Sequence, residues 1–314
     1  FLIPRHKPER LSRAHLLAWL EHNSDKRLIL ISAPPGYGKT TLLTDFASTS
    51  RLPLAWYQLD AVDGDPATFL AYLIECMRGL HPAFATVGNA ARALLNGEDA
   101  TAVSPTRILT VLINDLAELS VSDWVLVLED YHFITNPAIH ALVDYLLDSG
   151  PPGMHLIIST RGDPPLALPR LRARGLLAEL RSAVLIFTDQ EVSQWLSACA
   201  PELSQHSARA LSEKTEGWAA GLQLALSSLA DKDPASAERF IADLSGAHRF
   251  IFEYLAEEVF RRQPPEIQRF LLHTAVLTQM SAAVCNALLG VADAQATLEL
   301  IEQQNLFVVS LDEN

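Results

Sequence analysis

Gly38, Lys39 and Thr40 are residue types that, side by side, could bind the phosphates of a nucleotide. They end the pattern G-x-x-x-x-G-K-[ST], in which the lysine reaches the β- and γ-phosphates and the hydroxyl ligates Mg²⁺. The pattern has glycine where this chain has Ala33, the next smallest residue, so we expect the turn to keep its shape. Gly36 gives the loop a second flexible point. The stretch therefore predicts a phosphate-binding loop, or P-loop.

The pattern carries this chemistry only where a strand precedes it and a helix follows. Residues 28–32 form an apolar run typical of a buried strand, and apolar side chains mark one face of a helix in residues 42–46. Small loop residues let backbone N–H groups approach a phosphate, and the N-terminus of the next helix favours anions. This context disfavours the alternative of an ordinary turn with a chance Gly-Lys-Thr. The predicted nucleotide contacts are Ala33, Pro35, Gly36, Tyr37, Gly38, Lys39, Thr40 and Thr41.

Two adjacent carboxylates, Glu129 and Asp130, close a second apolar run at residues 124–128. Such a run is typical of a buried parallel strand. Because acidic residues at the end of such a strand lie near the phosphates in a P-loop protein, we expect Glu129 to hold Mg²⁺ through water. Asp130 would then polarise a water for attack on the γ-phosphate. Aspartate is more usual at the first position, so Glu129 is a longer substitute.

The next predicted strand, residues 156–161, has a polar carboxyl end. Arg161 lies at this end, where ligands of open α/β sheets bind. It could read the γ-phosphate, or it could be a salt-bridged surface residue. A locally basic segment further on could contact another domain or form a solvated face, and it contains Arg170, Arg172, Arg174 and Arg181.

The strand patterns indicate where the α/β part of the chain ends. Further apolar runs predict strands at residues 54–59, 176–180 and 184–187. From Thr188 onward, where a capping box begins a helix, helical patterns dominate up to a last predicted strand at 306–311. Residues 215–225 are a small-residue helix start that would permit close backbone approach.

These patterns predict three domains. An α/β P-loop NTPase domain, a parallel sheet flanked by helices, is expected over residues 1–187. An all-helical domain is expected over 188–240, and the family resemblance given with its motifs below implies that it is a lid. A truncated winged-helix domain is expected over 241–314, because helices there are followed by a single predicted strand.

Composition limits the function further. The chain has 314 residues and a formal net charge of −13, which argues against a surface that wraps nucleic acid. Its three cysteines are far apart in sequence, which fits a reducing cytosol and argues against a disulfide scaffold or a zinc site. No apolar run reaches the ~18 residues of a membrane span. We therefore expect a cytoplasmic protein without a membrane partner.

Five motifs follow one another along the chain. The P-loop segment at 32–41 precedes Glu-Asp-Tyr-His at 129–132, Thr-Asn-Pro-Ala-Ile-His at 135–140, Arg-Gly-Asp-Pro-Pro at 161–165 and Gly-Trp-Ala-Ala-Gly-Leu-Gln-Leu at 217–224. In this order they resemble the N-terminal part of the MalT-type large ATP-dependent regulators of the LuxR class. These are bacterial signal-transduction ATPases of the STAND group. The resemblance covers nearly the whole chain and implies ATP or ADP with Mg²⁺ as cofactors.

The resemblance also implies roles for single residues. Lys39 and Thr40 match the family's phosphate and Mg²⁺ residues, and the acidic pair 129–130 matches one that is usually two aspartates. Arg161 matches the arginine that reads the γ-phosphate. Arg13 falls where the family places an N-terminal arginine near the nucleotide.

A switching function is what the resemblance implies. In the family, a monomer holds ADP at rest, an inducer together with ATP drives self-association, and slow hydrolysis resets the state. The inducer and promoter DNA are bound by C-terminal domains, which this chain is expected to lack as an N-terminal fragment of a longer protein. We expect at most a slow ATPase. The alternatives are a working ATPase that acts on a macromolecular substrate and an interaction module with an empty P-loop.

Overall fold

The computed structural model divides the chain into two compact units. It describes residues 3–4, 11–80, 82–97, 103–119, 123–229, 232–244, 253–261, 263–303 and 306. We call Phe1–Ser32 with Lys39–Arg181 the sheet unit, and Ala33–Gly38 with Ser182–Asn314 the helical unit. The loop Ala33–Gly38 thus packs with the helical unit, although both its ends continue into the sheet unit. The three predicted domains stay a prediction.

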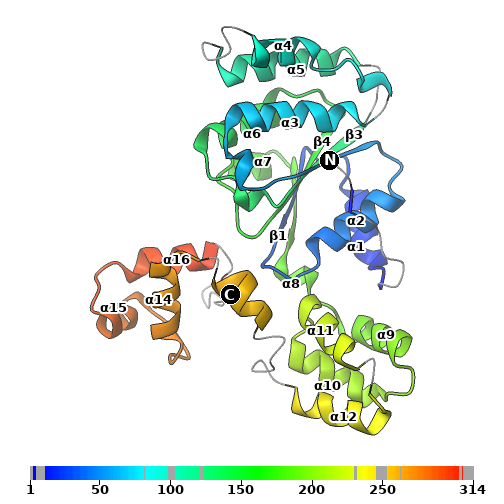
Figure 1. The fold of residues 1–314 in the computed structure, drawn as a ribbon, viewed down its shortest axis with the longest axis vertical. Helices are drawn as coiled ribbons and strands as arrows, with labels where there is room; N and C mark the ends of the chain where they lie inside the picture. Colours follow the sequence, from blue (N-terminus) through cyan, green and yellow to red (C-terminus); the bar gives the residue numbers. More distant parts are fainter. Residues whose placement is uncertain are drawn as a thin grey trace. The chain divides into compact units, whose positions relative to one another are not determined.

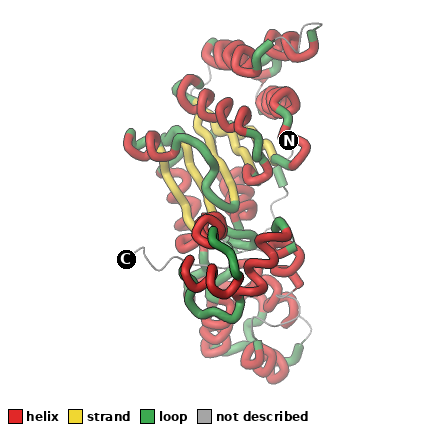
Figure 2. The backbone as a smooth tube through the Cα atoms, turned by 90° about the vertical axis from the view of Figure 1, so that its left-hand side faces the viewer, coloured by secondary structure: helices red, strands yellow, loops and turns green. Residues whose placement is uncertain are grey.

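The sheet unit contains one parallel sheet of five strands in the order β2-β3-β4-β1-β5 (Figures 1 and 2). The three central strands are buried at every position, because their continuous apolar runs face helices on both sides. The strands are β1 (Leu28–Ser32), β2 (Leu54–Gln58), β3 (Trp124–Glu129), β4 (Met154–Thr160) and β5 (Leu177–Arg181).

Strand register decides which residues meet at the carboxyl edge of the sheet. In β1, Ser32 is level with Thr160 on one side and with Arg181 on the other. Leu128 of β3 is level with Ile158 of β4. The P-loop, the acidic pair and Arg161 all follow strands at this one edge, as the sequence predicts.

Helices connect the strands and cover both faces of the sheet (Figure 1). Leu30, Leu128 and Ile158 point to the face covered by α3, α5 and α6, where the largest apolar core lies. Asparagine, aspartate or serine caps, each followed by proline, begin these three helices at Asp65, Ser104 and Asn136. The helices of this unit are α1 (Ala14–His22), α2 (Lys39–Thr49), α3 (Pro66–Arg78), α4 (Asn89–Asn96), α5 (Pro105–Ala117), α6 (Pro137–Ser149) and α7 (Leu168–Ala173), with short 3₁₀ turns η1 (Ala61–Gly64), η2 (Pro82–Phe84) and η4 (Tyr131–Phe133).

The helical unit is built from short helices. A capping box at Thr188 begins the second of them, as predicted. Its helices are α8 (Ser182–Leu185), α9 (Asp189–Cys199), α10 (Gln205–Thr215), α11 (Ala219–Leu229), α12 (Pro234–Asp243), the π-helical η5 (Leu255–Phe260), α14 (Pro265–Thr274), α15 (Ala282–Leu289) and α16 (Ala294–Gln303). A separate apolar core gathers the last three helices around Phe270, Cys285 and Ile301.

Membrane-spanning length is not reached by any single helix among the described residues. Only Ala282–Leu289 and Ala294–Glu302 taken together reach it by length and composition, and this pair is bent by 120°.

The strand predicted at residues 184–187 is wrong. Ser182–Leu185 form the short helix α8, directly after the edge strand β5. A helical turn buries Leu185, while Val184 and Ile186 stay 49% and 39% exposed. The apolar run looked like a strand, but no neighbouring strand pairs with it there. The strand predicted at 306–311 lies outside the described residues except for Leu306.

Candidate nucleotide-binding site

The P-loop combines two left-handed glycines with a helix N-terminus. Gly36 and Gly38 have φ angles of +80° and +79°, a region that side chains other than glycine rarely enter. Helix α2 begins at Lys39, and its first turn carries no acidic residue. The first N–H groups of a helix have no partner within the helix, so this end favours an anion.

Three charged side chains at this edge of the sheet act on Lys39. Its side chain is 8% exposed, and burial lowers the pKa of its ammonium group to about 8. The carboxylates of Asp130 and Glu129 oppose this shift, whereas the Arg161 guanidinium adds to it. Four residues that the sequence predicted from three separate stretches therefore act on one another.

Glu129 is fully buried, and neither of its carboxylate oxygens makes a hydrogen bond of normal geometry within the described residues. Burial raises the pKa of Glu129 to about 7, against the Thr40 hydroxyl and Lys39 and with the help of Asp130. Buried carboxylate oxygens without partners are uncommon in folded proteins and point to a ligand. Carboxylate and hydroxyl oxygens are the donors that Mg²⁺ prefers, so Glu129 and Thr40 fit this ion.

Asp130 has an unusual backbone. Its φ and ψ angles of 57° and 38° lie in the left-handed region, which aspartate tolerates better than most residues. This conformation ends β3 and starts the 3₁₀ turn that holds His132, whose Nδ1 lies 3.8 Å from Asp130 Oδ1. His132 is thus a residue of the turn η4. Next to it, the Tyr131 hydroxyl and His140 Nδ1 form a buried hydrogen bond of 2.9 Å.

Three further predicted contacts lie in different parts of the fold. Arg13 is 8% exposed and directly precedes α1. Thr41 is half-buried in the first turn of α2. Tyr37 lies in the helical unit, where burial and then the charge of Glu216 raise the pKa of its hydroxyl.

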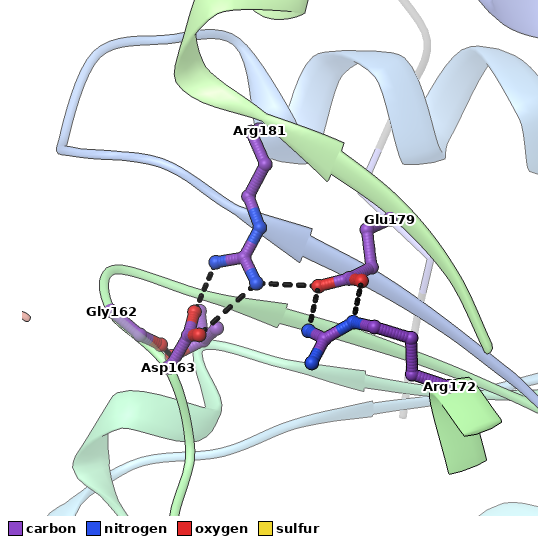
Figure 3. A network of polar contacts seen from close by, with 6 residues as sticks. Gly162, Asp163, Arg172, Glu179 and Arg181 are labelled. Atoms are coloured by element: carbon purple, nitrogen blue, oxygen red, sulfur yellow. Dashed lines mark hydrogen bonds and ion pairs between the residues drawn. The ribbon is translucent and has the colours of Figure 1, made fainter. Parts of the chain in front are cut away.

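The basic segment forms an ion-pair network on the sheet unit (Figure 3). Arg172 donates two hydrogen bonds to Glu179, of 2.9 and 3.0 Å. Arg181 donates to Glu179 at 2.5 Å and to both carboxylate oxygens of Asp163. The sequence reasoning missed Asp163 and Glu179, although the alternation of Glu179 and Arg181 along β5 could have suggested a shared face.

Within the helical unit, α11 begins against the P-loop backbone. The Ala220 amide donates to the Gly36 carbonyl at 2.9 Å, and Trp218 Nε1 donates to the Pro35 carbonyl at 3.2 Å. The predicted close backbone approach of this small-residue helix start is confirmed. Because a trans peptide holds its C=O and N–H in opposite directions, the amides of Gly36 and Tyr37 point away from these two donors. No sequence pattern indicated that Trp218 contacts Pro35.

The fold and the loop together define the class of protein. A parallel sheet with flanking helices and a phosphate-binding loop at the carboxyl ends of its strands is a P-loop NTPase fold. The chain is similar to the solved structure of a Walker-type ATPase of Pyrococcus abyssi, with a TM-score of 0.61 and 16% identity, over 98% of this chain and 93% of that one. At this identity the likeness shows the fold alone.

Sequence comparison gives the relatives. Residues 256–314 match the family model of the MalT winged helix domain. The chain is 35% identical to the HTH-type transcriptional regulator MalT of Serratia proteamaculans and 34% identical to that of Yersinia enterocolitica, in each case over 98% of this chain and 34% of the relative. The chain is therefore similar to the MalT-type regulators and spans about a third of their length. The resemblance predicted from the five motifs is confirmed.

Proposed function

We propose that this chain is the nucleotide-binding part of a transcriptional regulator, in which ATP or ADP sets the conformation. One observation carries the proposal: Lys39 of the P-loop lies in the combined field of Glu129, Asp130 and Arg161 at one edge of the sheet. The similarity of this chain to transcriptional regulators named MalT supports a regulatory role.

Each residue has a chemical role in this proposal. Lys39 and the loop amides bind the β- and γ-phosphates, while Thr40 and Glu129 hold Mg²⁺. When bound, Mg²⁺ neutralises charge on the phosphate oxygens. Asp130 orients the water that attacks the γ-phosphate. Arg161 binds that phosphate, and this contact distinguishes ATP from ADP.

A switch needs a ligand that binds its two states with different affinity, and it does not need fast turnover. ATP and ADP differ only at the γ-phosphate, so the groups that face it decide the switch. Self-association, an inducer and promoter DNA would enter through the full-length protein, and hydrolysis would reset the resting state. We expect turnover well below the ~1–100 s⁻¹ of kinases.

The first experiment is to denature the purified chain and identify any released nucleotide by chromatography. Stoichiometric ADP is the expected result for a closed resting state. A protein that releases nothing and also fails to bind added ATP or ADP would overturn the proposal.

Lys39→Ala provides the matching test. We expect at least about a 100-fold loss of ADP affinity, which is ~2.7 kcal/mol. The thermal stabilisation of the wild-type chain by ADP should disappear in this variant, because only a ligand that binds the folded state stabilises it. Lys26→Ala is the control and should keep the ADP response. Its ammonium group donates to the Gly175 carbonyl at 3.2 Å in the wild-type chain.

A further inference from the structure

The turn that carries Arg161 lies beyond the hydrogen-bonded sheet. The ladder between β1 and β4 ends with the pair Ser32 and Thr160, and the ladder between β3 and β4 ends earlier, at Leu128 and Ile158. Strand pairing therefore does not fix Arg161. A side chain also contacts this turn, because the Thr160 hydroxyl donates to the Gly162 carbonyl at 2.9 Å.

Asp163 anchors the other end of this turn. Both of its carboxylate oxygens accept hydrogen bonds from the Arg181 guanidinium, and the one between Nη2 and Oδ2 is 3.0 Å long (Figure 3). A guanidinium and a carboxylate that meet through two parallel bonds fix orientation as well as distance. The turn 161–163 is thus held at Thr160 on one side and at Asp163 on the other.

Arg181 lies beside the strand that leads into the P-loop, on the side opposite β4. Arg181 is the last residue of β5 and is level with Ser32, which in turn is level with Thr160. Neighbouring strands lie about 4.8 Å apart, so Thr160 and Arg181 are roughly 10 Å apart across β1. The bridge between Asp163 and Arg181 therefore spans the end of the strand that leads into the P-loop.

The guanidinium of Arg181 is itself oriented by the rest of the network. Glu179 accepts from Arg181 at 2.5 Å, and Arg172 fixes Glu179 through two hydrogen bonds. Hydrogen bonding from Arg172 lowers the pKa of Glu179, so the carboxylate stays charged. Two arginines and two carboxylates balance one another in charge. The network therefore orients the Arg181 guanidinium and adds no net charge beside Arg161.

We infer that Arg181 and Asp163 are positioning residues for Arg161, and that the preference of the site between ATP and ADP depends on this pair. The inference rests on the proposed function, in which Arg161 binds the γ-phosphate. The position of Arg161 matters only when a γ-phosphate is present. Loss of the pair should therefore weaken ATP binding and leave ADP binding nearly unchanged.

The test measures the affinities of ADP and of a non-hydrolysable ATP analogue, both with Mg²⁺, in the chain of residues 1–314. In Asp163→Asn we expect the ratio of the two dissociation constants, analogue over ADP, to rise about five- to tenfold. Arg181→Lys keeps the charge but loses the two-bond geometry, so it should shift the ratio in the same direction and guards against misfolding of the first variant.

Asp148→Asn is the matched control. It removes the acceptor of another partly exposed arginine pair in the sheet unit, Arg170 with Asp148 at 2.5 Å. This variant should leave the ratio within about twofold of the wild-type value.

Arg161→Ala distinguishes a failure of the positioning role from a failure of the proposed function. If Arg161→Ala raises the ratio but Asp163→Asn and Arg181→Lys do not, or if these two weaken both nucleotides equally, the positioning role is overturned and the proposed function stands. If Arg161→Ala itself leaves the ratio unchanged, the γ-phosphate role fails and the inference fails with it.

Discussion

The two glycines of the P-loop share a backbone conformation but differ in their surroundings. A Cβ at Gly36 would lie 2.7 Å from the Ala220 Cβ and 2.8 Å from Trp218 Nε1. Among the described residues, a Cβ at Gly38 would meet within 4 Å only the Ala219 Cβ, at 3.8 Å, an ordinary contact. Gly38 is therefore required by its backbone angle alone. Gly36 is required both by its angle and by the helix that packs on it.

This comparison extends to the two halves of the P-loop. Ala33–Gly38 is held through its backbone by the helical unit, whereas Lys39 takes part in the charges of the sheet unit. Substitutions in the first half should therefore change the packing against α11 in addition to any effect on nucleotide binding. Two substitutions test this packing, and a change of pH tests the sheet unit by comparison.

Gly36→Ala should have the largest effect on stability. Gly36→Ala and Gly38→Ala should each lose ~1 kcal/mol, because alanine is strained at a positive φ. The clash with Ala220 and Trp218 adds roughly 1–3 kcal/mol, as overpacking does in other cores. Urea unfolding of the two variants measures the difference. Equal losses would mean that the contact with α11 contributes nothing, and the comparison would fail.

Trp218→Phe should have a smaller effect. It removes the hydrogen bond to the Pro35 carbonyl, worth about 0.5–1.5 kcal/mol, and keeps a ring to pack on Tyr254, whose centroid lies 5.4 Å away. Hydrogen exchange of the amides of Ala33, Gly36, Tyr37 and Gly38 should become faster. Trp195→Phe is the control, because Trp195 lies on α9 of the same unit and stacks on Phe187, with ring centroids 5.2 Å apart. Faster exchange in both variants would contradict a direct role of Trp218.

Acidification should have the smallest effect, and it should act on the sheet unit. Burial lowers the pKa of His140 from its ordinary value, against the charge of Asp144. The folded state then binds fewer protons than the unfolded state once the pH falls below ~6.5, so the free energy of unfolding decreases from that pH downward. Comparing unfolding of the wild type and His140→Gln between pH 7.5 and pH 5.5 checks this, since the variant should lose less stability over this interval. An equal pH dependence in both proteins would contradict a lowered pKa of His140 in the folded state.

Much of the fold follows from local pattern. The three central strands carry apolar runs that are buried throughout, and the capped helix starts at Asp65, Asn136 and Thr188 are signalled by residues within three positions of one another. Such signals need only neighbours in sequence. They failed at residues 184–187, because an apolar run forms a strand only where another strand pairs with it.

The sequence by itself determined that this chain has a P-loop, an acidic pair and an arginine at strand ends, because each is a short motif next to a recognisable strand. Only the tertiary structure decided which distant residues meet. The pairing of Asp163 with Arg181 depends on β4 and β5 both flanking β1, and the need for glycine at position 36 depends on Trp218 and Ala220. These contacts join residues that are 18 to about 180 positions apart, and their geometry is set by strand register and helix packing, which local pattern does not encode.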